Sequence, residues 1–186
     1  MLAHSITIQY YAISVNNLVI IEELYHFRRV CFYTVRFDGE ELSETEKFIA
    51  RILDTPELER EYGTEMDTLI AILEFLGDVR GAQQKYFRQE NRAEALPPPR
   101  GTVEALHLDI DNRLRLYCVR LSDEVVVLFG GGIKTASAVQ DSPDVRMHFQ
   151  LAQRIARALD EVLRDGHWKV VGTEIFSDGQ ERLLYL

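Results

Sequence analysis

Basic side chains cluster in the second half of the sequence, at a spacing that could hold a phosphodiester. They occupy one short span: Arg113, Arg115, Arg120 and Lys134. Only Asp123 and Glu124 oppose them in that span. Cleavage of RNA without a metal needs a base for the 2′-hydroxyl proton, an acid for the leaving oxygen and fixed positive charge for the transition state. This part of the sequence supplies the charge that such chemistry requires.

The order of residues 113–120 indicates which side chains would work together. Polar and apolar residues alternate there, so Arg115 and Tyr117 fall on one face of a strand. A three-residue turn before this strand would place Asp109 opposite Arg115 and His107 opposite Tyr117. His107 or Asp109 would then act as the base, Tyr117 as the acid, and the cations as an electrostatic clamp. The residues predicted to be catalytic are Arg115, Arg120, Lys134, Tyr117 and His107.

A structural interpretation accounts for the same residues. Asp109 and Arg115 would form a cross-strand ion pair on a solvated face, and Tyr117 would pack its ring beneath a helix. The two interpretations differ in exposure, because RNA cleavage needs the cations to converge on an open, concave face. Cations that are each paired with carboxylates, or covered by helices, would favour a binding role instead.

An antiparallel meander would position these side chains. Hydrophobic residues alternate on either side of turns at 111–112 and 122–123, which predicts three strands within residues 104–130. A register that pairs Cys118 with Val127 keeps the apolar face continuous. The meander would therefore be part of a mainly antiparallel sheet.

Three consecutive glycines, 130–132, end the third predicted strand and precede Lys134. A phosphate-binding loop would need four residues between its glycines, and that spacing is absent. We interpret the glycines as a bulge or a tight strand exit where another backbone approaches closely.

The helix predicted after the meander, over residues 143–165, carries a row of arginines. Ser142 caps it and Pro143 is its first residue. Its polar face adds cations that we predict to bind nucleic acid together with Arg113: Arg146, Arg154 and Arg157. Residues 167–186 then form a predicted hairpin tail.

The N-terminal half predicts one well-buried strand at residues 30–37, which are β-branched and aromatic. Residues 5–29 fit either a strand or a short helix, and both alternatives stay open. A weak helix is predicted over 78–94. The prolines at 97–99 cannot continue a helix and favour an extended connector.

Two stronger helices lie between these segments. Ser43 and Glu46 form a capping box that starts a helix over residues 43–53. Thr64 offers a second cap, for a helix over residues 65–76 with a regular apolar stripe.

Composition restricts the class of protein. The 186 residues are 46% hydrophobic, carry a net charge of −9 and contain no apolar run long enough to span a bilayer, so we expect a cytoplasmic protein. The two cysteines lie in apolar strand-like runs. The five histidines are scattered, with no i, i+4 pair and no cysteine partner nearby, so we expect neither a zinc site nor another cofactor.

The block RLRLYCVRLSDEVVVLFGGGIKT, followed by a capped helix, resembles the RelE/HigB superfamily of bacterial toxins, in particular its phage-type branch. The resemblance covers residues 103–165. It implies a compact antiparallel sheet with helices that cleaves mRNA on the ribosome with basic residues, and a cognate antitoxin that wraps it. The strand arginines would be Arg115 and Arg120, and the basic residue at the strand exit would be Lys134. Family members are usually smaller and basic, whereas this chain is acidic.

Together these interpretations predict an α+β fold: a mainly antiparallel sheet with a RelE-like meander, covered by helices, and a helical insertion. The predicted parts are an N-terminal strand and helical segment (1–96), a Pro-rich connector (97–102), the meander and helix (103–166) and a hairpin tail (167–186). The leading functional prediction is a toxin that acts on mRNA or the ribosome, is neutralised by an antitoxin, and has no membrane partner. The alternative is a non-catalytic interaction or regulatory module that forms homo-oligomers through its helices.

Overall fold

A seven-stranded sheet forms the centre of the protein. The computed structural model describes residues 17–99, 101–102, 113–135, 142–179 and 181–186. In sheet order the strands are β3 (Arg88–Glu90), β4 (Ala93–Leu96), β5 (Leu114–Arg120), β6 (Val125–Ile133), β2 (Cys31–Phe37), β1 (Leu18–His26) and β9 (Leu183–Tyr185). β2 and β6 are parallel, and all other neighbouring pairs are antiparallel.

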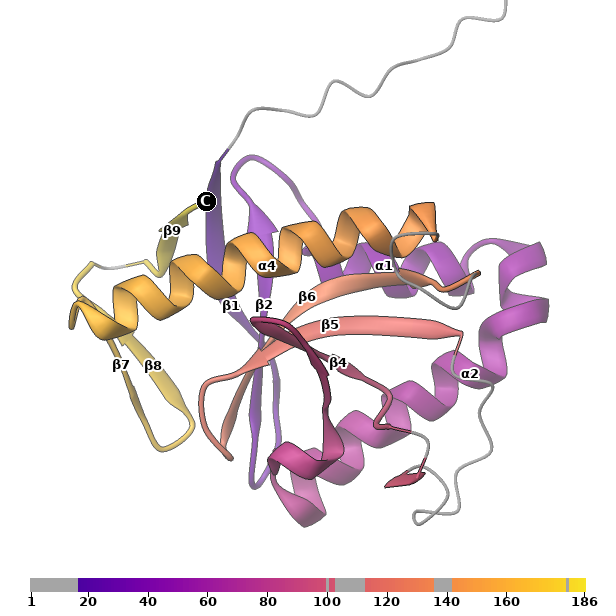
Figure 1. Cartoon of the computed structure of the whole chain (residues 1–186), viewed down its shortest axis with the longest axis horizontal. Helices are drawn as coiled ribbons and strands as arrows, with labels where there is room; N and C mark the ends of the chain where they lie inside the picture. The colour runs from indigo at the N-terminus through magenta and orange to yellow at the C-terminus, as the bar shows by residue number, and fades with distance from the viewer. Residues whose placement is uncertain (1–16, 100, 103–112, 136–141, 180) are drawn as a thin grey trace, which may run out of the picture.

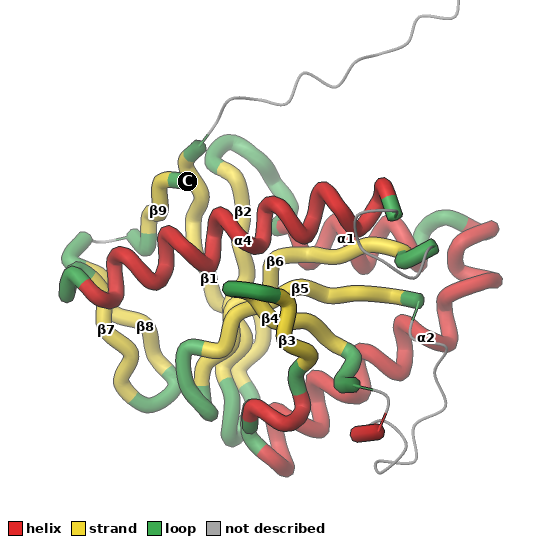
Figure 2. Tube along the Cα trace, viewed as in Figure 1, coloured by secondary structure: helices red, strands yellow, loops and turns green. Residues whose placement is uncertain are grey.

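Helices cover both faces of this sheet (Figure 1). One face packs against α1 (Glu44–Leu53) and α2 (Pro56–Phe75), and the other against α4 (Pro143–Arg164). A second, two-stranded sheet of β7 (Trp168–Val171) and β8 (Glu174–Ser177) projects beside the main sheet near the C-terminal end of α4 (Figure 2). The mixture of helices and a mostly antiparallel sheet confirms the predicted α+β class.

Alternation along the strands produces two separate cores. In β5, Tyr117 belongs to the core under α4, whereas Leu116 and Cys118 belong to the core under α1 and α2. The same division runs through β6, where Val127 faces α4 and Leu128 faces the other helices. The period of two predicted for this segment is therefore confirmed.

The capping box at α1 is confirmed in detail. Ser43 Oγ accepts a hydrogen bond from the Glu46 amide at 3.3 Å, and the Glu46 carboxylate accepts one from the Ser43 amide at 2.8 Å. The Ser43 hydroxyl also donates to that carboxylate at 2.6 Å. Two amide groups that the first turn leaves without helical partners are thereby satisfied.

This box predicts a pH-dependent contribution to stability. The hydrogen bonds from the Ser43 side chain and backbone hold the pKa of Glu46 below its ordinary value of 4.5. A carboxyl group with a lowered pKa stabilises the fold above its unfolded-state pKa and loses that contribution as the pH falls through the folded-state pKa. We expect Glu46→Gln to lower the free energy of unfolding by about 0.5–1 kcal/mol at pH 7. Urea unfolding at a series of pH values should show the difference shrinking below pH 4.5; a difference independent of pH would contradict this.

Other predicted elements begin or end elsewhere. The second helix does not start at Thr64 but at Pro56, with two residues between it and the end of α1, so Thr64 lies inside α2. Proline at the first helical position is favourable because its missing amide hydrogen has no partner there. The side chain of Thr68 donates to the Thr64 carbonyl at 2.9 Å, which is the bond of a residue inside a helix.

The weak helix predicted over residues 78–94 is wrong. A π-helical turn (Leu76–Arg80) ends α2, a short 3₁₀ turn (Gln84–Tyr86) follows, and the chain then forms the β3–β4 hairpin. Asn91 adopts a φ of 59° at the tip of this hairpin. The tertiary pairing of β4 with β5 decides the structure of these residues.

Register and connections differ from the sequence predictions in further respects. Cys118 pairs with Leu128 instead of Val127, in register with the Arg120–Val126 pair near the turn, and the register then shifts between Leu116 and Cys118. Residues 18–26 form β1, so the helical alternative for this segment is wrong. The proline connector joins β4 to β5, which are neighbours in one sheet. The first strand of the predicted meander lies outside the described residues. None of the described helices, the long α2 and α4 included, is apolar enough to cross a lipid bilayer.

Candidate functional site

Three of the residues predicted to be catalytic come together under the N-terminal half of α4. Arg115 and Tyr117 follow each other along one face of β5, and Lys134 lies just beyond β6. Arg88 and Glu90 of β3 complete the group, because both interact electrostatically with Arg115 and Lys134. We call these five residues the basic cluster. It holds three cations and one carboxyl group.

The basic cluster is largely covered. Only 4% of Arg115 and none of Tyr117 is exposed to solvent. The ring of Phe149 on α4 packs edge-on against Tyr117, with 6.0 Å between the ring centroids. The Tyr117 hydroxyl is buried and has no hydrogen-bond partner among the described residues. This is the packed ring beneath a helix that the structural interpretation predicted.

Burial and charge set the protonation of the basic cluster. Burial lowers the pKa of Arg115, and the neighbouring Arg88 lowers it further. The pKa of Lys134 is lowered by burial and by Arg115 and Arg88. Burial raises the pKa of Glu90 despite these cations, and raises the pKa of Tyr117. Tyr117 therefore keeps its proton at neutral pH, as an acid must, but its ring is enclosed.

Arg120 does not join the basic cluster. It lies over the ring of Phe87, which belongs to the core under α1 and α2. Its guanidinium is paired with Glu94 at 3.4 Å and with Asp123 at 2.9 Å, and it donates to the Ala82 carbonyl at 2.6 Å. Arg115 and Arg120 are therefore on opposite faces of the sheet and cannot hold one phosphate between them.

Arg113 also turns towards the α2 side. Its guanidinium lies 2.9 Å from a carboxylate oxygen of Glu61 and stacks on the ring of Tyr62 at 4.5 Å from the centroid. The two remaining candidates for the general base, His107 and Asp109, lie outside the described residues.

The arginines predicted on the polar face of the last helix are exposed on α4. Arg146, Arg154 and Arg157 all face solvent, and Arg154 donates to the Asn17 side chain at 3.0 Å. Met147 lies beside Arg146 and is 66% exposed. The outer side of α4 thus combines positive charge with an exposed apolar side chain.

Sequence reasoning missed the ion pair that fixes the start of α4. Arg51 of α1 binds both carboxylate oxygens of Asp144, at 2.6 and 3.0 Å, and the Ile133 amide donates to the same carboxylate at 2.7 Å. Arg51 and the Ile133 amide hold the pKa of Asp144 below its ordinary value in spite of its burial. One carboxylate therefore joins α1, β6 and α4. Its only sequence signal was an acidic residue in the first turn of a helix.

None of the comparisons with known proteins finds a match. No protein-family model, no curated protein and no solved structure matches this chain. The RelE/HigB resemblance therefore remains a prediction, and function has to be argued from the geometry of the molecule.

A groove runs between the C-terminal half of α4 and the end of β5, and none of the basic-cluster residues lines it. Its volume is about 390 Å³ and its walls are mainly apolar: Val119, Leu121, Ala156, Leu159 and Leu163. Arg92 from the β3–β4 turn and Asp160 of α4 supply charged side chains, and Arg120, whose guanidinium points to the opposite face, also lines it. We call it the α4 groove. Among the described residues, the one group of three side chains suited to a metal ion is Glu23, His26 and Cys31, which lies elsewhere.

Proposed function

We propose that this chain is a non-catalytic interaction module that binds an acidic, partly apolar segment of a partner protein along α4. The α4 groove is the observation that carries the proposal, because it offers apolar walls beside exposed cations. A groove lined in this way accepts the apolar side chains of an amphipathic segment, while charges at its edge fix the orientation of that segment.

The charges around the α4 groove favour an acidic partner. Arg92 lines the groove and is exposed, Arg157 is exposed on α4 directly after the lining residue Ala156, and Asp160 is the acidic group among the lining residues. Farther along α4, Arg146 and Met147 extend the same exposed side. Arginine and methionine are enriched at protein interfaces relative to the rest of the surface. A protein carrying net charge −9 attracts a polyanion such as RNA only locally, so a short acidic segment suits this surface better.

The burial of the predicted catalytic groups supports a non-catalytic role. A general acid has to come within hydrogen-bond reach of the leaving oxygen, and Tyr117 has no exposed surface from which to do so. Arg120 is paired with Glu94 and Asp123. Cations that are paired with carboxylates or covered by helices are the features expected of a binding module.

Charge reversal at the groove tests the proposal. We expect Arg92→Glu/Arg157→Glu to weaken binding of a fluorescein-labelled acidic amphipathic peptide by about tenfold, because two attractive contacts become repulsive. Fluorescence anisotropy measures the affinity, and binding by the wild type should weaken as salt rises. Arg60→Glu/Lys85→Glu is the matched control, since it changes the net charge equally at exposed positions away from α4. Equal affinity for the two double variants, or no binding by the wild type, would overturn the proposal.

The basic cluster favours a second candidate function, RelE/HigB-like cleavage of mRNA. Arg88, Arg115 and Lys134 concentrate positive charge beside Tyr117, as stabilisation of a phosphorane-like transition state requires. An antitoxin would then be the acidic partner on α4. Inducible expression in bacteria separates the candidates: a toxin arrests growth and depletes mRNA in the wild type but not in Lys134→Ala. An interaction module leaves both strains growing equally.

A further inference from the structure

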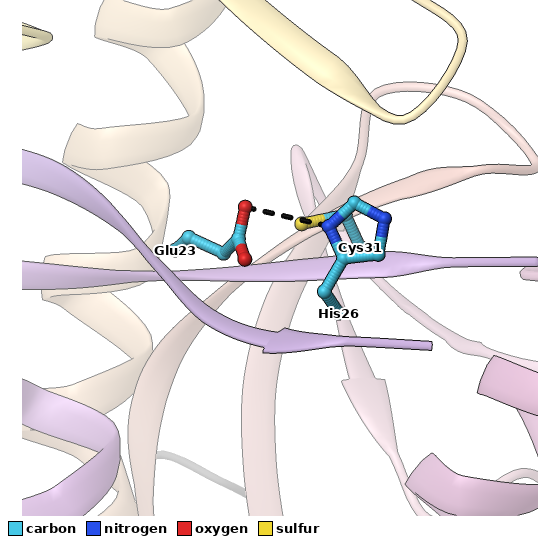
Figure 3. A group of neighbouring side chains, drawn as sticks. All are labelled: Glu23, His26 and Cys31. Carbon is cyan, nitrogen blue, oxygen red and sulfur yellow. Dashed lines mark hydrogen bonds and ion pairs between the residues drawn. The ribbon is translucent and has the colours of Figure 1, made fainter. Parts of the chain in front are cut away.

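Three side chains with metal-ligating atoms meet at the β1–β2 hairpin. They are Glu23 and His26, both exposed, and the buried Cys31. One carboxylate oxygen, one imidazole nitrogen and the thiol sulfur all lie within 4.8 Å of one another. Figure 3 shows the carboxylate and the imidazole turned towards each other beside the sulfur, and Glu23 Oε2 lies 3.5 Å from His26 Nδ1.

An irregularity in β1 creates this arrangement. The ladder between β1 and β2 pairs Glu23 with Tyr33 and His26 with Cys31, and its register shifts between Glu23 and Tyr25. In a regular strand, residues three apart point to opposite faces. The extra residue of a bulge reverses this alternation and places Glu23 and His26 on the same side. The hairpin turn brings Cys31 directly opposite His26.

We propose that Glu23, His26 and Cys31 form a binding site for a divalent metal ion of the zinc type, with water as the fourth ligand. Thiolate, imidazole and carboxylate are the three ligand types that zinc takes from proteins, and sites with three protein ligands keep one position open. Binding converts the Cys31 thiol to the thiolate and releases its proton to the solvent.

The spacing of the donors fits a tetrahedral ion. Bond lengths of about 2.0–2.1 Å to nitrogen and oxygen and about 2.3 Å to sulfur require the ligands to stand roughly 3.3–3.6 Å apart. The carboxylate and imidazole already meet this requirement at 3.5 Å. The sulfur lies within 4.8 Å of both, so these donor atoms have to move about 1 Å closer to it. Rotation of the exposed Glu23 and His26 side chains provides this movement.

The Cys31 thiol is hydrogen-bonded to the side chains of Glu23 and Tyr33, and burial raises its pKa to about 12, so a bound metal ion has to displace the thiol proton. Arg182 is the nearby cation, and its guanidinium donates to the carbonyl groups of Ile21 at 2.9 Å and Ile175 at 3.3 Å. The neighbouring Tyr33 hydroxyl is engaged with the β7–β8 hairpin through the Ile175 amide at 3.3 Å. Glu23 and His26 are exposed, so a metal ion could reach the three donor atoms from the solvent side.

Titration with Zn²⁺ and Co²⁺ tests the site on the full chain, kept reduced. We expect Zn²⁺ to bind with one-to-one stoichiometry by calorimetry, and Co²⁺ to give a thiolate-to-metal charge-transfer band in the near ultraviolet. His26→Gln should weaken Zn²⁺ binding at least about tenfold, since a direct ligand matters no less than the outer groups that orient one. Cys31→Ser should abolish the cobalt band. The other cysteine, Cys118, is buried in the core on the opposite face and should not contribute to that band.

A second histidine–carboxylate pair provides the matched control. His167 Nδ1 lies 2.9 Å from Asp178 Oδ2, and both side chains are exposed, but neither cysteine belongs to this pair. His167→Gln/Asp178→Asn should therefore leave Zn²⁺ affinity and the cobalt band unchanged. Circular dichroism should confirm that every variant is folded. Absence of saturable Zn²⁺ binding, a cobalt complex without the thiolate band, or unchanged affinity in His26→Gln would overturn the proposal.

Discussion

Gly131→Ala is expected to lower the free energy of unfolding by about 3 kcal/mol or more. A Cβ atom at this position would lie 2.9 Å from the carbonyl carbon of Arg115 and 3.0 Å from Cε1 of Phe48. The first neighbour is the backbone of β5, which cannot move without breaking its ladder to β6. The second is a buried core ring on α1. Neither can yield cheaply in a close-packed interior.

Equilibrium unfolding in urea measures this loss, and another glycine supplies the control. Gly63 lies inside α2, and a Cβ there would meet only Glu59 Cγ at an ordinary 3.5 Å. Because alanine is a far better helix former than glycine, Gly63→Ala should stabilise the protein by about 0.5–1 kcal/mol. The two Gly→Ala changes should thus have opposite signs. A loss below about 1 kcal/mol for Gly131→Ala would show that β6 adjusts to the extra atom.

This glycine segment shows what the sequence could predict. Because the spacing of a phosphate-binding loop is absent, the three glycines are interpreted as a place where another backbone approaches closely. The structure confirms this: α1 packs over Gly130 and Gly131, and the first turn of α4 packs over Gly132. What could not be predicted was the identity of the approaching elements. That depends on β2 lying parallel to β6, a contact between segments about 90 residues apart in the chain.

Local signals were reliable where the deciding interaction is local. The capping box at Ser43 and Glu46 depends on residues three apart, and the structure forms it as predicted. The β3–β4 hairpin was missed because the run Ala-Glu-Ala-Leu of β4 has weak strand propensity. Its structure is decided by pairing with β5, including a hydrogen bond at 3.0 Å from the Arg120 amide to the Glu94 carboxylate.

The same limit applies to the site residues. Alternation placed Arg115 and Tyr117 correctly on one face, but it gives no information on which face α4 covers. Arg120 is an odd number of positions from Arg115 on the same strand, so strand alternation itself places the two side chains on opposite faces. The proximity of His26 and Cys31 was not predicted, because the two residues are five positions apart in the chain and only the β1–β2 hairpin pairs them.

Tyr117→Phe and Tyr117→Ala are expected to differ widely in stability, because the ring and the hydroxyl of this residue contribute very differently. The ring is fully buried against Phe149, so its removal in Tyr117→Ala should cost about 3–5 kcal/mol. The hydroxyl is buried with no hydrogen-bond partner in the described part of the chain. Burying such a group unpaired is unfavourable, so Tyr117→Phe should leave stability unchanged or raise it by up to about 1 kcal/mol.

The phenylalanine variant also separates structure from catalysis at the basic cluster. If Tyr117 only fills the core under α4, Tyr117→Phe retains both the stability and every activity of the wild type. If Tyr117 donates a proton during RNA cleavage, the same variant keeps its stability in urea but loses cleavage of a labelled RNA and growth arrest on expression. A loss of stability above about 1 kcal/mol in Tyr117→Phe would instead mean that the hydroxyl has a partner in the folded protein, and the packing argument for a non-catalytic Tyr117 would fail.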